Sequence, residues 1–135
     1  MIKNYEKHNK PMILINFGTP FRSLQISQAE AFLHEPITRV IDLSFNVDPD
    51  QEMLPQFKKI MGKLKLGNDD LRAEPVVVNL PQQNYLSVMV LAELHARMGY
   101  FPRIIRTRMK SSGILPYYEV AEVIDLQAIE DQLNS

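Results

Sequence analysis

Cysteine is absent from this chain, and its absence excludes disulfide bonds and thiolate zinc sites and fits a reducing compartment. A formal net charge of -1 gives no bulk attraction to duplex nucleic acid or to an anionic membrane, so an anionic ligand must be held by local groups. The sequence also lacks a signal-peptide pattern and an apolar run of membrane-spanning length. We therefore expect a cytoplasmic protein with no membrane partner and no duplex nucleic-acid partner.

The composition predicts one globular domain. Of the 135 residues, 45% are hydrophobic and 23% are charged, which is usual for a folded domain of this size. No segment is repeated or low in complexity. Residues 1–11 mix charges without a period and are predicted to form a loose leader, so the single domain is expected to occupy residues 12–135.

Residues 74–99 organise the predicted fold as a strand, a polar turn and a helix. The unbroken β-branched run at 76–78 is typical of a strand that is covered on both faces, as in the middle of a parallel sheet. From 86 to 92 the helix is apolar nearly all round, with only Ser87 interrupting, and Gly99 is its predicted C-cap. One sheet cannot cover such a helix. Either a neighbouring helix or the same helix of a second copy must cover it, and we favour a two-fold homodimer.

The turn at 79–84 is rich in neutral amides. It has none of the glycines and no lysine of a phosphate-binding P-loop. Its position at the end of a parallel strand is nevertheless where open α/β sheets bind ligands. Asn and Gln carry a donor beside an acceptor, the pattern that pairs with the N6 and N7 edge of adenine. An equally good interpretation is that these amides cap the helix, with Asn84 as the N-cap.

A second buried strand is predicted at 12–17, and it ends in Asn16, Phe17, Gly18, Thr19 and Pro20. Gly18 permits a tight turn or a close ligand approach, and Thr19 can cap the turn or donate to a phosphate. A plain turn explains these residues as well. We expect this strand to neighbour the one at 76–80, which would place Asn16 and Asn79 at matching strand ends.

The remaining segments complete an alternating pattern. Ser27 and Glu30 have the spacing of a capping box and predict a helix that runs to Leu33. The connection at 44–53 contains Asp48 and Asp50, but no further ligands lie at metal-site spacing, so no metal is assigned. The other predicted elements are a strand at 38–43, a helix at 55–64, a connection at 67–72, strands at 103–110 and 117–124, and a helix at 126–133 capped by Asp125.

Arg106, Arg108 and Lys110 alternate along one of these strands and so point to one side of it. Such a stripe can contact phosphates. We favour the interpretation that it solvates an outer strand and pairs with Glu119 and Glu122 of the next strand.

Together these elements predict an α/β fold: a three-layer, Rossmann-like or flavodoxin-like sheet that is mostly parallel, with an antiparallel edge hairpin. The hairpin is inferred because the last connection is too short for a crossover between parallel strands.

Three segments of the chain resemble the small stand-alone Csx-type ancillary proteins of type III CRISPR systems. They are Met-Ile-Leu-Ile-Asn-Phe-Gly at 12–18, Leu-Ala-Glu-Leu-His-Ala-Arg-Met-Gly-Tyr-Phe-Pro at 91–102, and Glu-Val-Ala-Glu-Val-Ile-Asp-Leu-Gln at 119–127. The resemblance implies a CARF-like fold, that is, a dimeric Rossmann-like sensor of cyclic oligoadenylate second messengers. It also implies that the two strand-end loops face their copies across the two-fold axis, so that a symmetric ring lies across both.

The function expected from this resemblance is binding of a cyclic oligoadenylate, with cyclic tetra-adenylate as the expected ring, and its sequestration to damp type III CRISPR signalling. The alternatives are a metal-independent ring nuclease and, below it, a structural interaction subunit. No residue clearly matches a cleavage motif, so no catalytic residue, metal or cofactor is assigned. The residues assigned to ligand binding are Asn16, Phe17, Gly18, Thr19, Pro20, Asn79, Leu80, Pro81, Gln82, Gln83, Asn84, Ser87 and Arg106.

Overall fold

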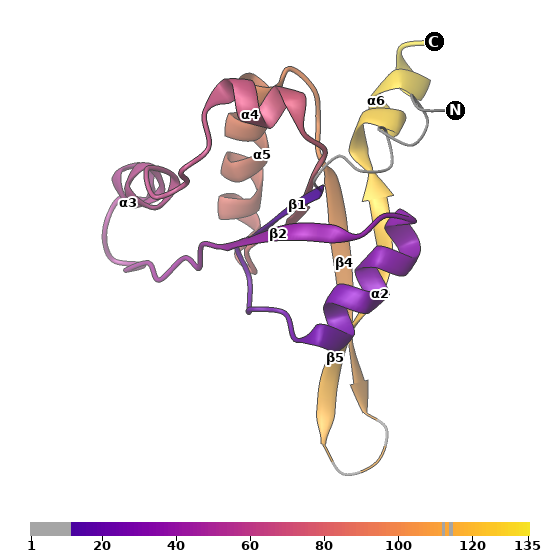
Figure 1. Cartoon of the computed structure of the whole chain (residues 1–135). Helices are drawn as coiled ribbons and strands as arrows, with labels where there is room; N and C mark the ends of the chain where they lie inside the picture. Colours follow the sequence, from indigo (N-terminus) through magenta and orange to yellow (C-terminus); the bar gives the residue numbers. More distant parts are fainter. Residues whose placement is uncertain (1–11, 112, 114) are drawn as a thin grey trace.

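A computed structural model describes residues 12–111, 113 and 115–135 of the chain (Figure 1). The predicted leader at 1–11 lies outside the described residues. The elements in chain order are β1 (Met12–Asn16), α2 (Ser23–Leu33), β2 (Ile37–Asp42), α3 (Met53–Met61), α4 (Asn68–Ala73), β3 (Val76–Asn79), α5 (Asn84–Met98), β4 (Arg103–Ser111), β5 (Pro116–Asp125) and α6 (Leu126–Leu133).

The strands form one five-stranded sheet in the order β2-β1-β3-β4-β5. All neighbours are parallel except β4 and β5, which pair antiparallel. The predicted fold class is therefore confirmed: an α/β sheet that is mostly parallel and carries an antiparallel edge pair. The order 2-1-3-4-5 is that of flavodoxin-like sheets, in which the order of successive strands across the sheet reverses between β1 and β3.

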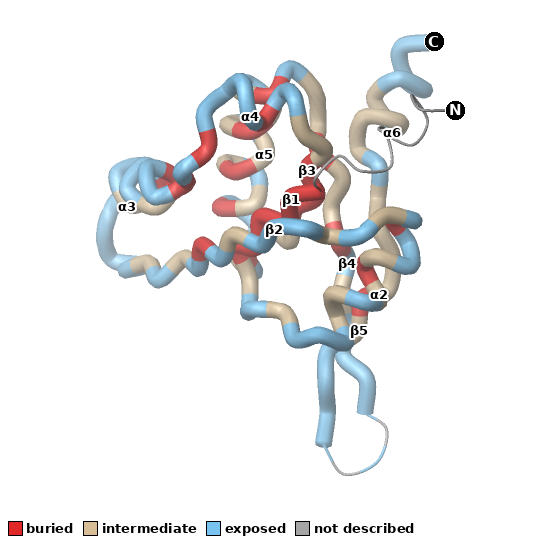
Figure 2. The backbone as a smooth tube through the Cα atoms, in the orientation of Figure 1, coloured by how far each residue is buried: buried red, intermediate tan, exposed pale blue. Residues whose placement is uncertain are grey.

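Helices cover both faces of the sheet, because alternate side chains of the buried strands point to opposite sides. On one face Ile13, Ile15, Val76 and Val78 pack with apolar residues of α3, α4 and α5. The opposite face is packed by α2. There Met12, Leu14, Val77, Ala29 and Leu33 share a cluster with Ile105 and Val120. Figure 2 shows the buried segments concentrated in β1, β3 and the inner side of α5.

Helix α2 begins five residues earlier than the capping-box spacing predicted, because its N-cap is Arg22 rather than Ser27. The backbone N–H of Arg22 donates to the side-chain oxygen of Gln25 at 2.7 Å. The carboxylate of Glu30, assigned to the predicted box with Ser27, instead accepts a hydrogen bond from the backbone N–H of Ile37 at 2.7 Å. A tertiary contact with the start of β2 therefore replaces the predicted local one.

Helix boundaries differ from prediction at three further places. The connection expected at 67–72 is the helix α4, whose start is held by a hydrogen bond from the Gly67 N–H to the Asp70 carboxylate at 3.2 Å. Helix α3 covers Met53–Met61, so Pro55 lies inside its first turn. Gln83 is the N-cap of α5, whereas Asn84 is its first residue and accepts from the Tyr85 N–H at 2.8 Å.

The antiparallel pair β4–β5 extends away from the other strands (Figure 1). Two of the three residues of its basic stripe are paired with acids as predicted. Arg106 forms an ion pair with Glu122 at 2.7 Å, and Arg108 pairs with Glu119. The free edge of β5 is partly covered by α2, because Gln25 donates to the carbonyl of Tyr118 and Gln28 accepts from the N–H of Val120, both at 2.9 Å.

None of the helices described by the structure has both the length and the apolar character needed to cross a lipid bilayer.

Replacing Gly99 by alanine should lower the free energy of unfolding by about 1 kcal/mol, because Gly99 adopts a left-handed conformation (φ 86°) that strains an L side chain. A Cβ there would contact nothing within 4 Å, so the whole cost is conformational. Urea denaturation measures it. Gly62→Ala is the matched control, since Gly62 has a right-handed helical conformation (φ -63°) that alanine adopts without strain. Equal stability of the two variants would contradict the prediction.

Candidate functional site

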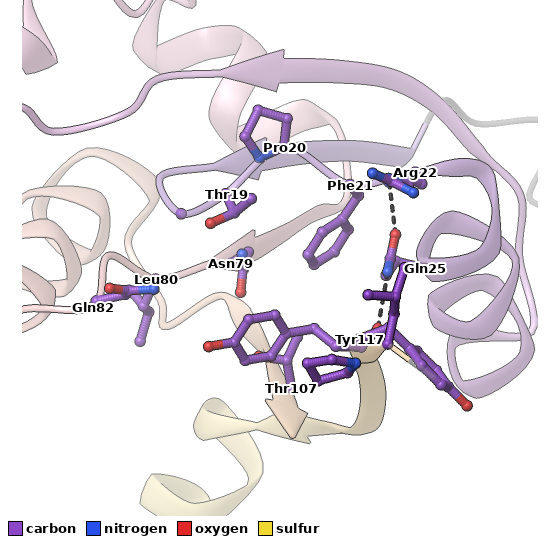
Figure 3. A pocket seen from close by; sticks show the side chains of 14 residues that line it. Thr19, Pro20, Phe21, Arg22, Gln25, Asn79, Leu80, Gln82, Thr107 and Tyr117 are labelled. Atoms are coloured by element: carbon purple, nitrogen blue, oxygen red, sulfur yellow. Dashed lines mark hydrogen bonds between the residues drawn. The ribbon is translucent and has the colours of Figure 1, made fainter. Parts of the chain in front are cut away.

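A cavity of about 680 Å³ opens at the carboxyl ends of the strands, beside the point between β1 and β3 where the strand order reverses. Its size falls in the range of small-molecule sites. Three parts of the chain build it: the loop after β1 with the start of α2, the end of β3, and the β4–β5 pair (Figure 3). The residues that line it are Gly18, Thr19, Pro20, Phe21, Arg22, Gln25, Asn79, Leu80, Gln82, Thr107, Leu115, Pro116, Tyr117 and Tyr118.

The floor of the site is a hydrogen-bonded pair of amides. Asn16 and Asn79 are register partners at the ends of β1 and β3, and the Asn79 side-chain nitrogen donates to the Asn16 Oδ1 at 3.0 Å. The predicted juxtaposition of these two residues is therefore confirmed. Asn16 also accepts from the Gly18 N–H at 2.9 Å and donates to the Thr19 carbonyl at 3.0 Å. It is fully buried, so it shapes the loop and lies beneath the cavity wall.

Position 18 must be glycine because the loop after β1 packs too closely against Asn79 and Leu80 to leave room for a side chain. A Cβ at this position would lie 2.8 Å from the Asn79 side-chain nitrogen and 3.4 Å from the Leu80 carbonyl oxygen. The loop after β1 therefore rests directly against the end of β3.

The cavity walls combine aromatic, amide and cationic groups. Phe21 points toward the strands between Asn79 and Gln25 (Figure 3), and Tyr117 and Tyr118 line the wall formed by β5. Among the described residues that line the cavity, Arg22 carries the positive charge, and no carboxylate is present. Such a lining suits a flat ring that stacks on aromatic side chains and an anionic group that contacts the guanidinium.

A smaller cavity of about 280 Å³ adjoins the same loop. It shares Gly18, Thr19, Pro20 and Gln82 with the larger one. Its remaining lining residues are Phe17, Ser44, Phe45 and Gln83. Phe45 stacks between Phe17 and Phe57, with ring centroids 5.7 and 6.1 Å apart, so a packed aromatic row lies beside this cavity.

The structure brings most of the predicted site residues together. Gly18, Thr19, Pro20, Asn79, Leu80 and Gln82 line the larger cavity, and Phe17 and Gln83 line the smaller one.

The other predicted site residues have structural contacts instead. Pro81 is buried, and the Ser87 hydroxyl donates to the carbonyls of Pro81 and Gln83 at 2.8 and 3.2 Å, which closes the turn before α5. Asn84 does not line either cavity. Arg106 is not brought to the site, because its guanidinium is held by Glu122 on β5.

The sequence-based assignment of ligand contacts did not include the lining residues from two parts of the wall, the start of α2 and the β4–β5 pair. Phe21 and Arg22 follow Pro20 directly, and their place between a strand end and a helix start was an available signal. The contribution of Thr107, Tyr117 and Tyr118 had no local signal, since it depends on the contacts of α2 with β5.

The two acids considered as cation ligands make a local turn. The Asp50 N–H donates to the Asp48 carboxylate at 2.9 Å. Within residues 12–111, 113 and 115–135, no group of three or more His, Asp or Glu side chains is placed to hold a metal ion.

Comparisons of the chain with models of protein families, with curated proteins and with solved structures found no match.

Replacing Asn16 by alanine should lower the free energy of unfolding by about 3 kcal/mol, because it removes a fully buried side chain and leaves the part-buried Gly18 N–H, Thr19 carbonyl and Asn79 amide without their partner. Chemical denaturation checks this value. Asn84→Ala is the control, since Asn84 is exposed, and it should change stability by less than about 0.5 kcal/mol. Similar losses in both variants would contradict the role of Asn16.

Proposed function

We propose that this chain binds a cyclic oligoadenylate at the strand-end cavity and sequesters it, with cyclic tetra-adenylate as the first ligand to test. The observation that carries the proposal is the cavity at the β1–β3 reversal, lined by amides, aromatic rings and one arginine. The resemblance to Csx-type proteins of type III CRISPR systems supports the choice of a cyclic adenylate among nucleotide ligands.

Each part of an adenylate has a matching group in the wall. An adenine ring can stack on Phe21 or Tyr117, and base stacking on aromatic side chains contributes about 1 to 3 kcal/mol per base. Arg22 stands at the start of α2, where a phosphate is favoured both by the guanidinium and by the helix N-terminus. Thr19 supplies a hydroxyl on the same loop.

A two-fold homodimer through α5 forms part of the proposal. Leu86 and Val90 are buried in the chain's own core, and Met89 packs against it. On the outer side Val88 is 66% exposed and Tyr85 is 45% exposed. These apolar side chains favour cover by a second copy, which would let one symmetric ring contact two strand-end loops.

Sequestration is favoured over cleavage because the described cavity lining holds a single ionised side chain. Cleavage needs groups that stabilise the transition state more than the bound ring. Among the described lining residues the ionised group is Arg22, and the amides can hold a ground-state phosphate without accelerating its reaction. The ring-nuclease alternative therefore depends on Arg22, and the same experiment separates the two functions.

Pure protein in excess should retain labelled cyclic tetra-adenylate, and the ring should be recovered intact after long incubation. Cyclic tri- and hexa-adenylate serve as competitors of other ring sizes. Arg22→Gln should weaken binding about tenfold, because a charge-assisted contact to phosphate is lost. Arg39→Gln, which changes an exposed arginine outside the cavity, is the matched control.

If the wild-type protein yields linear products and Arg22→Gln does not, the function is ring cleavage rather than sequestration. Failure to retain any of the three rings would overturn the proposed ligand and favour a structural interaction subunit.

The protein is expected to have the mass of a dimer in light scattering at micromolar concentration. Val88→Glu should shift it to a monomer, because the proposed contact would bury a carboxylate beside apolar side chains. Leu54→Glu places the same charge on an exposed position of α3 and should leave the dimer intact. A wild-type monomer would rule out the proposed dimer.

A further inference from the structure

The orientation of the Asn79 side chain is fixed by its neighbours. We infer that Asn79 presents its side-chain oxygen to the cavity and thereby favours a ligand group that donates a hydrogen bond there. This inference rests on the proposed function, because it concerns which group of the bound nucleotide meets the floor of the same site. The sequence predicted that the amide side chains of this turn pair with both the N6 donor and the N7 acceptor of adenine. In the structure, the Asn79 oxygen is placed to pair with a donor.

Two backbone groups of unambiguous chemistry set the orientation of Asn16. The Gly18 N–H can only donate and contacts Asn16 Oδ1 at 2.9 Å, whereas the Thr19 carbonyl can only accept and contacts Asn16 Nδ2 at 3.0 Å. A flipped Asn16 amide would place nitrogen against N–H and oxygen against carbonyl. Asn16 is fully buried, so water cannot relieve either mismatch.

Asn16 in turn sets the orientation of Asn79. The Asn79 Nδ2 donates to Asn16 Oδ1 at 3.0 Å, and a flip would bring two amide oxygens together. The nitrogen also lies against the Gly18 backbone, since a Cβ there would come within 2.8 Å of it. The Asn79 oxygen is left pointing into the cavity, away from β1 (Figure 3).

The other amides of the cavity do not share this role. Gln25 uses its oxygen for the Arg22 N–H and its nitrogen for the Tyr118 carbonyl, so both of its ends are engaged by the protein. Gln82 is exposed and makes no side-chain hydrogen bond within the part of the chain that the structure describes. It can rotate to present either end, which makes it the matched control for Asn79.

An adenylate has two kinds of donor that can meet the Asn79 oxygen, the exocyclic N6 amino group and a ribose hydroxyl. The N7 atom of adenine is an acceptor and gains nothing there. The protein should therefore bind a ring that lacks the donor contacted by Asn79 more weakly than cyclic tetra-adenylate. A change at N7 should leave the affinity nearly unaltered.

The first test uses the ligand-free protein, so it does not depend on which ligand binds. In side-chain amide spectra, the Asn79 Nδ2 proton that is hydrogen-bonded to Asn16 should exchange with solvent at least tenfold more slowly than either side-chain amide proton of Gln82. Equal exchange at the two amides would overturn the fixed orientation even if every ring binds.

The second test compares cyclic tetra-adenylate with three matched rings: one with hypoxanthine, one with 7-deaza-adenine and one with 2′-deoxyribose. Wild-type protein should lose about tenfold in affinity for either the hypoxanthine or the deoxyribose ring, which identifies the donor, and should bind the 7-deaza ring within threefold. Asn79→Ala should bring the discriminated ring within threefold of cyclic tetra-adenylate. Gln82→Ala should leave the discrimination unchanged.

Equal binding of all four rings by wild-type protein would overturn the inference while leaving the proposed function intact. Discrimination that survives in Asn79→Ala would also overturn it. If no ring binds, the proposed function fails, and the exchange measurement alone decides whether the Asn79 acceptor is fixed.

Discussion

The arrangement of the strand-end cavity depends on one buried amide, that of Asn16. A polar side chain without water must satisfy its hydrogen bonds inside the protein, and Asn16 does so with Gly18, Thr19 and Asn79. Its neighbours on β1 are aliphatic and fill the two faces of the sheet. The last residue of the strand thus joins the apolar core to the loop that lines the cavity.

The wall opposite this floor is built by contacts between α2 and β5. Gln25 and Gln28 bond two backbone groups of the outer strand, and those bonds hold the aromatic residues of β5 near the start of α2. The same contacts protect a sheet edge that would otherwise be open to pairing with another chain. One set of hydrogen bonds therefore contributes both to covering the sheet edge and to the shape of the site.

The turn between β3 and α5 is stabilised from within. Pro81 is buried and the Ser87 hydroxyl bonds two carbonyls of the turn, so Asn79 and Gln82 project from a braced segment. Some residues that the sequence predicts as ligand contacts therefore stabilise the loop instead, and other residues of that loop face the cavity. Ser87, Pro81 and Asn16 are of this kind, whereas Thr19, Asn79 and Gln82 face the cavity.

The sequence by itself determined the alternation of strands and helices, because the unbroken apolar runs of β1 and β3 and the cap at Gly99 are local signals. It also determined that Asn16 and Asn79 end neighbouring strands and that Arg106 and Arg108 pair with acids on β5. The sequence misplaced the start of α2, because Glu30 bonds the backbone of Ile37 instead of forming the predicted capping box. It also missed α4, a short helix with acidic residues in its first turn. Only the tertiary structure decided which residues line the cavity together with Asn79. Phe21, Arg22, Thr107 and Tyr117 meet because sheet order and helix packing bring distant segments together, and no local spacing encodes that meeting.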